Sequence, residues 1–386
     1  MKKQNLLTRM LLLCALIAGS GSAWADEIYV KVTDVSDLAA GDKLILAGQI
    51  ETGDYYAMGA MKSTNRSAVE VTPETDGSII LVDGVTVLTL GGSTGAWTFH
   101  DGNGYLWASG GTSSNHLKVS AELVSGQTDA TISISSGIAT IKFNLSGGAN
   151  ARNWLRLNQS KSGSTYNPLY SCYKSGQLDV SIYKLTKVSG TISASGYNTF
   201  SSPYKLDLNT LSGADGAYVA SGVTDGKVVL TKSTAKMAAS TTDSETGLFI
   251  KGTKDATFTI DVTADDATFS GTNLLLAAPS GKTVEAAGSG YNYVFGWETA
   301  SNPGFYLIGG TSATLGAGKA YLHTTTALTT PSGRAGFIFE DEDVTGIQSV
   351  VKQTTNNTSY YDLQGRRVAQ PTKGLYIVNG KKVIIK

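Results

Sequence analysis

The sequence predicts an all-β protein, and three features of it carry that prediction: many turn-forming residues, few charges, and apolar residues in alternate positions. Glycine occurs 45 times in 386 residues, and charged residues make up only 16% of the chain. Helices with solvated outer faces usually carry more charge than this, whereas short strands joined by tight turns do not need it. Apolar and polar residues alternate with the period of a half-buried strand in segments 131–135, 140–145 and 257–262. Only segment 235–239 favours a helical turn.

The N-terminal segment has the pattern of a secretory signal peptide, residues 1–25. Lys2, Lys3 and Arg9 precede and flank a short apolar core at 10–18, and Ala23-Trp24-Ala25 is a small-residue cleavage site. The apolar run is too short to span a bilayer, and no later run is long enough. Lipid attachment at Cys14 is the weaker alternative, because the residue before it is a bulky leucine. Cleavage would leave Cys172 as a lone cysteine, which we expect to be a buried, inert thiol.

The first domain is expected to cover residues 26–187 and contains an internal period. Tyr56, Tyr105 and Trp154 begin similar triplets that are spaced by 49 residues each time. Each triplet follows one expected strand and is followed by a polar loop and another apolar run. Three such units are typical of a β-trefoil, in which no single repeat can bury its own apolar face. A β-sandwich in which the spacing is coincidental is the alternative.

The second domain, residues 188–345, lacks this period. Its short apolar runs are separated by turn signals every dozen or so residues, which favours a β-sandwich. The acidic run 340–343 marks its end. Four carboxylates could bind calcium, but the spacing of a calcium loop is absent, and a solvated linker is the better interpretation.

The C-terminal segment, residues 346–386, is expected to be a linker followed by a short hairpin tail. Tyr360 and Tyr361 lead into a turn at Gln364-Gly365, and the run 375–378 leads into Asn379-Gly380. Asn-Gly is the strongest short signal for a two-residue hairpin, because both residues of that turn need positive φ.

The chain resembles exported surface proteins of Bacteroidota. In the first domain the likeness is carried by VTDVSDLAAGDKLILAG, VLTLGGSTGAWTF, NGYLWAS, and RNWLRLNQ to SCYKSGQLDVSIYKL, and in the tail by SYYDLQGRRVAQPTKGLYIVNGKKVIIK. The first domain is similar to an accessory β-module, the second to a non-catalytic region of Bacteroides- and Prevotella-type proteins, and the tail to a C-terminal sorting domain. The resemblance implies export to the cell surface, outer membrane or medium, with the export machinery as a partner.

No catalytic, cofactor-binding or metal-binding residues are predicted. The three histidines do not have the spacing of a zinc site, and no nucleophile elbow is present. The segment Gly316-Ala317-Gly318-Lys319 fails as a phosphate loop and is interpreted as a turn. Asp101-Gly102-Asn103-Gly104 resembles part of a calcium loop but is interpreted as a hairpin turn. Asp265 and Asp266 are adjacent and would point to opposite faces of a strand.

Aromatic residues of the first domain are the remaining candidates for function. Rings beside amide and guanidinium groups suit carbohydrate binding, because flat apolar rings cover sugar C–H faces and the polar groups bond hydroxyls. Filling of the core is the competing interpretation for each ring. The predicted ligand-binding residues are Trp107, Trp154, Tyr105, Arg156 and Asn158.

These observations predict a non-catalytic secreted or cell-surface protein that binds or adheres, with carbohydrate as one ligand. Glycans and extracellular matrix or surface proteins are the expected partners. A formal net charge of zero offers no footprint for nucleic acid. An extracellular hydrolase with an unrecognised active site and a purely structural envelope component are the alternatives.

Overall fold

A computed structural model describes residues 26–297, 302–309, 312–328, 333–340, 360–362, 366–368, 373–378 and 381–385. Across these ranges the chain is built of strands, and the only helical segments are the short 3-10 turns η1 (Val35–Asp37) and η2 (Gly148–Asn150). The prediction of an all-β fold is confirmed. The chain forms two compact units, residues 1–340 and 341–386. The expected signal peptide lies outside the described residues, as does most of the expected linker.

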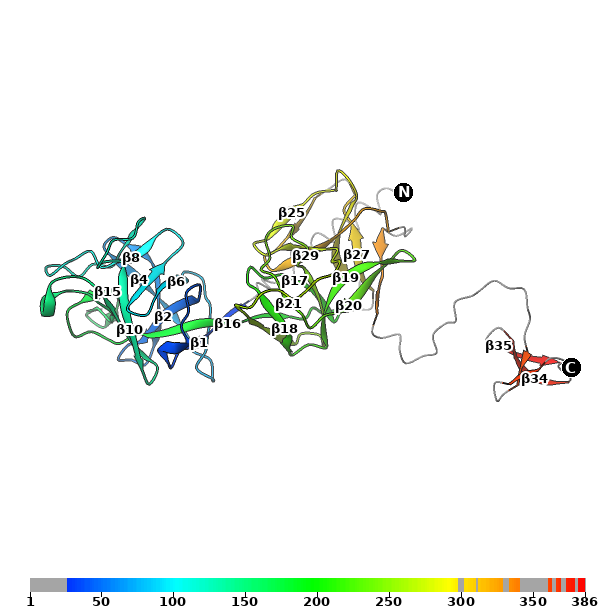
Figure 1. Ribbon diagram of the computed structural model, residues 1–386, viewed down its shortest axis with the longest axis horizontal. Coiled ribbons are helices and arrows are strands. Elements are labelled where there is room, and N and C mark those ends of the chain that lie inside the picture. The colour runs from blue at the N-terminus through cyan, green and yellow to red at the C-terminus, as the bar shows by residue number, and fades with distance from the viewer. Residues whose placement is uncertain are drawn as a thin grey trace. The chain divides into compact units, whose positions relative to one another are not determined.

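A closed barrel of six antiparallel strands forms the first part of unit 1 (Figure 1). Its strands are β2 (Lys43–Gln49), β6 (Leu88–Ser93), β7 (Ala96–His100), β10 (Asp129–Ser135), β11 (Ile138–Phe143) and β16 (Ser181–Thr191). Neighbours in this order pair with each other, and β16 returns to β2. The pairing between Ala139 and Val180, just before β16, closes the ring. Closure leaves no barrel edge unpaired.

Three hairpins cap this barrel, one in each repeat. They are β3–β4 (Tyr55–Lys62, Asn65–Val71), β8–β9 (Tyr105–Trp107, Lys118–Ser120) and β12–β15 (Trp154–Asn158, Leu169–Tyr173). In every repeat the hairpin follows the first barrel strand along the chain and precedes the second. This order is the topology of a β-trefoil. The period of 49 residues therefore reports a real repeat, since it marks the first strand of each hairpin. The small strands β13 (Lys161–Ser162) and β14 (Thr165–Tyr166) extend the third hairpin.

Side chains from all three repeats fill the barrel. Equivalent pairs are Leu44 and Leu46, Trp97 and Phe99, and Ile141 and Phe143, all of them buried in one cluster. No repeat could bury these residues alone, because each contributes only two barrel strands.

A buried ion pair joins the first and second repeats. The Arg66 guanidinium is 1% exposed, and its Nη1 lies 2.6 Å from Oδ2 of Asp101. Arg66 also donates to the Gly59 carbonyl and the Thr86 hydroxyl. Burial opposes ionisation of Asp101, but hydrogen bonds from Arg66 and from the Asn103 backbone N–H hold the pKa of its carboxyl below the usual range. The predicted hairpin turn at 101–104 is confirmed, and its carboxylate has this additional structural role.

Strand β16 continues from the trefoil into the second part of unit 1 (Figure 1). Its first half pairs with β2, and its second half, Lys187–Thr191, pairs with β23 (Thr257–Val262). On the remaining side it pairs with β1 (Asp26–Lys31), which also pairs with β5 (Ile79–Ile80). The expected boundary between residues 187 and 188 therefore falls within a continuous strand.

The second part of unit 1 is a stack of sheets, as the sandwich prediction requires, with one layer more than a two-sheet sandwich. The central sheet contains β17 (Tyr197–Phe200), β22 (Leu248–Lys251), β19 (Gly216–Thr224), β20 (Lys227–Lys232) and β31 (Phe337–Phe339). Both of its faces are buried. Leu248 and Ile250 belong to one core and Phe249 to another, as alternation along a strand requires.

One outer layer combines the end of β16 with β23, β18 (Leu206–Ser212) and β21 (Lys236–Met237). The other contains β24 (Leu275–Ala278), β29 (Lys319–Thr324), β26 (Tyr291–Trp297), β27 (Pro303–Leu307) and β30 (Arg334–Ala335). A two-stranded antiparallel sheet of β25 (Lys282–Val284) and β28 (Ala313–Leu315) contributes to a further small core with this sheet.

The prediction of a helical turn at 235–239 is wrong. Met237 pairs with Leu206 across the β18–β21 ladder and is 2% exposed. Burial of this side chain in the core between the sheets outweighs the weak local preference for a helix.

Unit 2 contains a four-stranded antiparallel sheet in the order β33-β32-β34-β35. Its strands are β32 (Tyr360–Tyr361), β33 (Arg367–Val368), β34 (Gly374–Val378) and β35 (Lys381–Ile385). Val378 pairs with Lys381, so two residues connect β34 to β35, as the hairpin prediction requires. Both expected turn pairs, 364–365 and 379–380, lie outside the described residues.

Candidate functional site

The five predicted ligand-binding residues lie on two of the three trefoil hairpins. Tyr105 and Trp107 belong to β8, whereas Trp154, Arg156 and Asn158 belong to β12. The two groups are therefore in different repeats. We consider each group separately.

On β8, the aromatic side chains are engaged with neighbouring residues. The Tyr105 ring packs edge-on against His100, with 5.0 Å between ring centres. Trp107 is half-buried, and its Nε1–H donates to Oε1 of Gln127 at 2.6 Å. This hydrogen bond uses the only donor of the indole side chain. Trp107 can therefore offer its ring surface to a ligand, but no free polar group.

On β12, alternation places Trp154, Arg156 and Asn158 on the same face of the strand. The residues opposite Trp154 and Arg156 on β15 are Tyr173 and Ser171. Nδ2 of Asn158 donates to the Tyr173 hydroxyl at 2.8 Å, and Oδ1 of Asn158 accepts from the Ser160 backbone N–H. These bonds fix the amide and the phenol relative to each other.

Two cations lie against the Trp154 ring. The Arg156 guanidinium carbon is 4.8 Å from the ring centre, and Nζ of Lys142 is 5.5 Å from it. Arg156 is 8% exposed and forms an ion pair with Asp179. Burial lowers the pKa of the Arg156 guanidinium, which still stays charged because its ordinary pKa is so high. This buried cation therefore holds one side of the indole in place.

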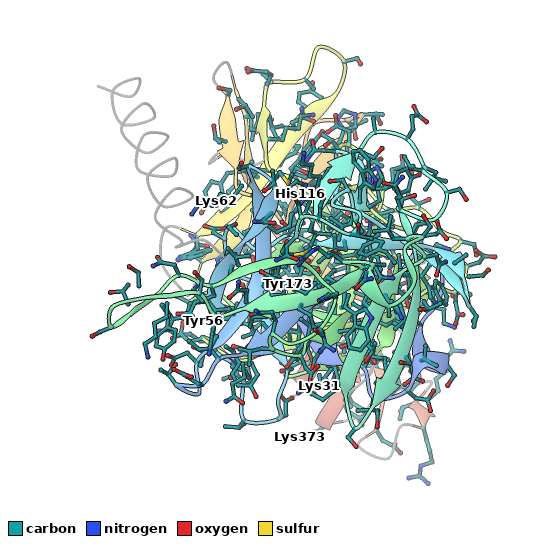
Figure 2. The ribbon with its side chains drawn as sticks, turned by 90° about the vertical axis from the view of Figure 1, so that its left-hand side faces the viewer. Lys31, Tyr56, Lys62, His116, Tyr173 and Lys373 are labelled. Carbon is teal, nitrogen blue, oxygen red and sulfur yellow. The ribbon has the colours of Figure 1, made fainter. Side chains whose placement is uncertain are left out.

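Lys142 and Trp154 belong to a row that crosses four neighbouring strands. Thr131 on β10 lies opposite Lys142 on β11, Lys142 lies opposite Trp154, and Trp154 lies opposite Tyr173. Directly opposed residues of antiparallel strands project from the same side of the sheet. Thr131 and Lys142 are exposed, Trp154 is half-buried and Tyr173 is buried. Figure 2 labels Tyr173 among the trefoil side chains.

We call the set Lys142, Trp154, Arg156, Asn158 and Tyr173 the Trp154 face. It combines one partly accessible indole, one exposed ammonium and a fixed pair of an amide and a phenol. Such a surface can cover an apolar C–H face of a ligand and bond its hydroxyl or anionic groups. The face contains no paired acid and base and no activated nucleophile.

Lys142 was missed by the sequence analysis. It lies 12 residues before Trp154, in a segment whose alternation indicates a strand but not its neighbour. The contact depends on the register of β11 against β12, which the polar loop between these strands does not reveal. Tyr173 is in the sequence next to Cys172, but its link to Asn158 also depends on register.

Other aromatic residues of the trefoil fill the core instead. Trp97 is 5% exposed and Tyr170 is 0% exposed, and both belong to the barrel cluster. Tyr170 donates its hydroxyl to the Tyr56 carbonyl at 2.5 Å. The prediction that Cys172 is a buried thiol is confirmed, since it is 0% exposed and burial raises its pKa.

Lys319 is a largely buried lysine in a structural contact. Lys319 does not lie in a phosphate loop. It is in strand β29 after the predicted turn, and its Nζ donates to Oδ1 of Asn198 at 2.8 Å. Burial lowers the pKa of the Lys319 ammonium to about 8.

Asp265 and Asp266 form ion pairs with different lysines, Lys236 and Lys205. Within the ranges that the structure describes, no group of three or more His, Cys, Asp or Glu residues could hold a metal ion.

Comparisons with protein-family models, with curated proteins and with solved structures found no match. In the described part of the chain, no helix is long and apolar enough to cross a membrane.

Proposed function

We propose that this chain is a non-catalytic exported protein that binds carbohydrate through the Trp154 face. The observation that carries the proposal is the partly accessible Trp154 ring, which a buried and paired Arg156 holds in position. A ring fixed before binding loses little conformational freedom when a ligand stacks on it. The export part of the proposal is supported by the sequence pattern of residues 1–25 and by the C-terminal tail.

Polar neighbours favour a sugar over a purely apolar ligand. The exposed neighbours of Trp154 in its row are a threonine and a lysine, and the amide of Asn158 is bonded to the Tyr173 hydroxyl. An apolar docking surface would instead place several aliphatic residues around the ring. The Trp154 face therefore suits a flat ligand with one apolar side and a hydroxyl-rich rim.

Glycan-array binding followed by affinity electrophoresis tests the proposal. The purified protein should bind at least one polysaccharide, and Trp154→Ala should abolish the retardation, because the stacking ring is lost. Tyr291→Ala is the matched control, since Tyr291 is an exposed ring of the second part of unit 1 at 37% exposure. Binding that survives Trp154→Ala, or the absence of binding to all glycans, would refute this function.

A further inference from the structure

Lys142 has no acidic partner among the described residues, although it lies beside a ring. Its side chain is exposed, and its Nζ is 5.5 Å from the centre of the Trp154 ring. No ion pair involving Lys142 is found within the described ranges, whereas Arg156 on the same face is paired with Asp179. The ammonium is therefore available to an anion from outside.

The equivalent positions of the other two repeats have different neighbours. Tyr56 lies opposite Gly48 and Glu70. Burial and then the carboxylates of Glu70 and Asp54 raise the pKa of the Tyr56 hydroxyl. An anionic ligand would therefore be repelled at the first repeat.

In the second repeat, Tyr105 lies opposite His100 and Ser120. His100 is already engaged, since its ring contacts Tyr105 and its Nδ1 accepts from the Gly102 backbone N–H at 3.1 Å. At these three equivalent positions, only the third repeat places a lysine directly opposite the aromatic residue. The fold is repeated, but the lysine at this position is not; in the second repeat Lys118 lies opposite Trp107 instead, two residues further along the strand.

From this juxtaposition we infer that the Trp154 face selects acidic polysaccharides whose sugars carry carboxylates, such as polyuronates. The inference rests on the proposed carbohydrate binding and adds its substrate class. The C–H face of a uronate ring covers the indole, and its carboxylate accepts a charge-assisted hydrogen bond from the Lys142 ammonium. Arg156 contributes by holding the indole and not by binding the carboxylate, because Asp179 already neutralises it.

Polygalacturonate and its fully methyl-esterified form are matched probes, because esterification removes the charge and keeps the sugar backbone. The protein should bind polygalacturonate about tenfold more tightly than the ester, as one hydrogen bond to a charged group predicts. Lys142→Gln should remove this difference, and Lys142→Arg should keep most of it. Lys62→Gln is the control, since it removes a charge from an exposed lysine of the first hairpin.

The outcomes separate the inference from the function on which it rests. Equal affinity for the two polymers, with loss of both in Trp154→Ala, would overturn the acidic preference and leave carbohydrate binding intact. A preference for polygalacturonate that survives Lys142→Gln would also overturn the inference. If neither these polymers nor any array glycan is bound, both proposals fail.

A sulfated glycan bound in preference to polygalacturonate would overturn the choice of carboxylate. Where the preference holds, it should weaken as salt is added, because exposed charges are screened.

Discussion

Phe249 in the second part of unit 1 and Trp154 in the trefoil are both strand aromatics, but their surroundings differ. Phe249 is 0% exposed, and its ring centre lies 5.0 Å from that of Phe295 and 5.1 Å from that of Phe337. Trp154 is half-buried, and the cations of Arg156 and Lys142 lie over its ring. The Phe249 ring packs against rings from other strands, whereas the Trp154 ring packs against two charged side chains.

The difference follows from layer position. Phe249 belongs to β22, the strand whose residues Leu248, Phe249 and Ile250 fill the cores on the two faces of the central sheet. Trp154 begins a cap hairpin of a barrel whose interior is already filled by residues such as Phe143. Its ring is half-buried, and the cationic side chains of Arg156 and Lys142 lie over it. Aromatic content alone does not distinguish these two situations.

The largest effect should come from Phe249→Ala. Removing a buried ring that touches several others should lower the free energy of unfolding by about 3–5 kcal/mol. Urea unfolding followed by circular dichroism measures this change. A loss below about 1 kcal/mol would mean that the ring cluster is loosely packed, contrary to the comparison.

Arg66→Met should destabilise the trefoil by about 3 kcal/mol, because it leaves the buried Asp101 carboxylate without its ion-pair partner. Adding Asp101→Asn to this variant should recover part of the loss, since the uncompensated charge is then removed. The control is Lys205→Met, which breaks the exposed pair with Asp266 and should change stability by about 1 kcal/mol or less. The same urea experiment separates these values. An equal loss for the two single variants would contradict the role given to the buried pair.

Lys319 gives a pH-dependent prediction. Its pKa is about 8 in the folded chain, below the unfolded value of about 10.4. The unfolded state therefore binds more protons between these values, and this group makes stability rise as pH increases through that window. Lys319→Met should remove that rise, so the stability difference between variant and wild type should shrink from pH 7.5 towards pH 10. The tyrosines and Cys172 have raised pKa values and make stability fall as pH increases. Their contributions are the same in both proteins and cancel in the difference. A difference that is constant with pH would show that the lysine is not desolvated.

The smallest effect on folding should come from Trp154→Ala. Because the ring is half-buried and lies on the outer side of its hairpin, we expect a loss of about 1 kcal/mol or less. A thermal melt beside that of Phe249→Ala checks the comparison directly. A loss as large as that of Phe249→Ala would make Trp154 a core residue and would remove the basis for the binding proposal.

Much of the fold was predictable because its physical causes are local or periodic. Alternation in 257–262 predicted β23, and the spacing of Tyr56, Tyr105 and Trp154 favoured the three repeats of a trefoil over a sandwich. The third layer of the second part was not predictable, since short apolar runs look alike whether one or two faces are covered. The short strand at 236–237 was mistaken for a helical turn because its pairing partner, Leu206, lies far away in the sequence.

The candidate site was predicted only in part. Trp154, Arg156 and Asn158 share a strand, so their common face follows from alternation alone. Lys142 and Tyr173 reach the same face through cross-strand register, and Asp179 reaches Arg156 through the path of the chain before β16. Tyr105 and Trp107 belong to another repeat, although their residue types matched the same chemical pattern.

The most direct test of the central claim is an NMR titration of the indole N–H signals with galacturonate oligosaccharides, with Trp154 assigned from Trp154→Phe. If the Trp154 face binds the ligand, the Trp154 signal should shift in proportion to saturation while the signal of the buried Trp97 stays in place. A titration in which the Trp154 signal does not move at ligand concentrations that saturate binding would contradict the account.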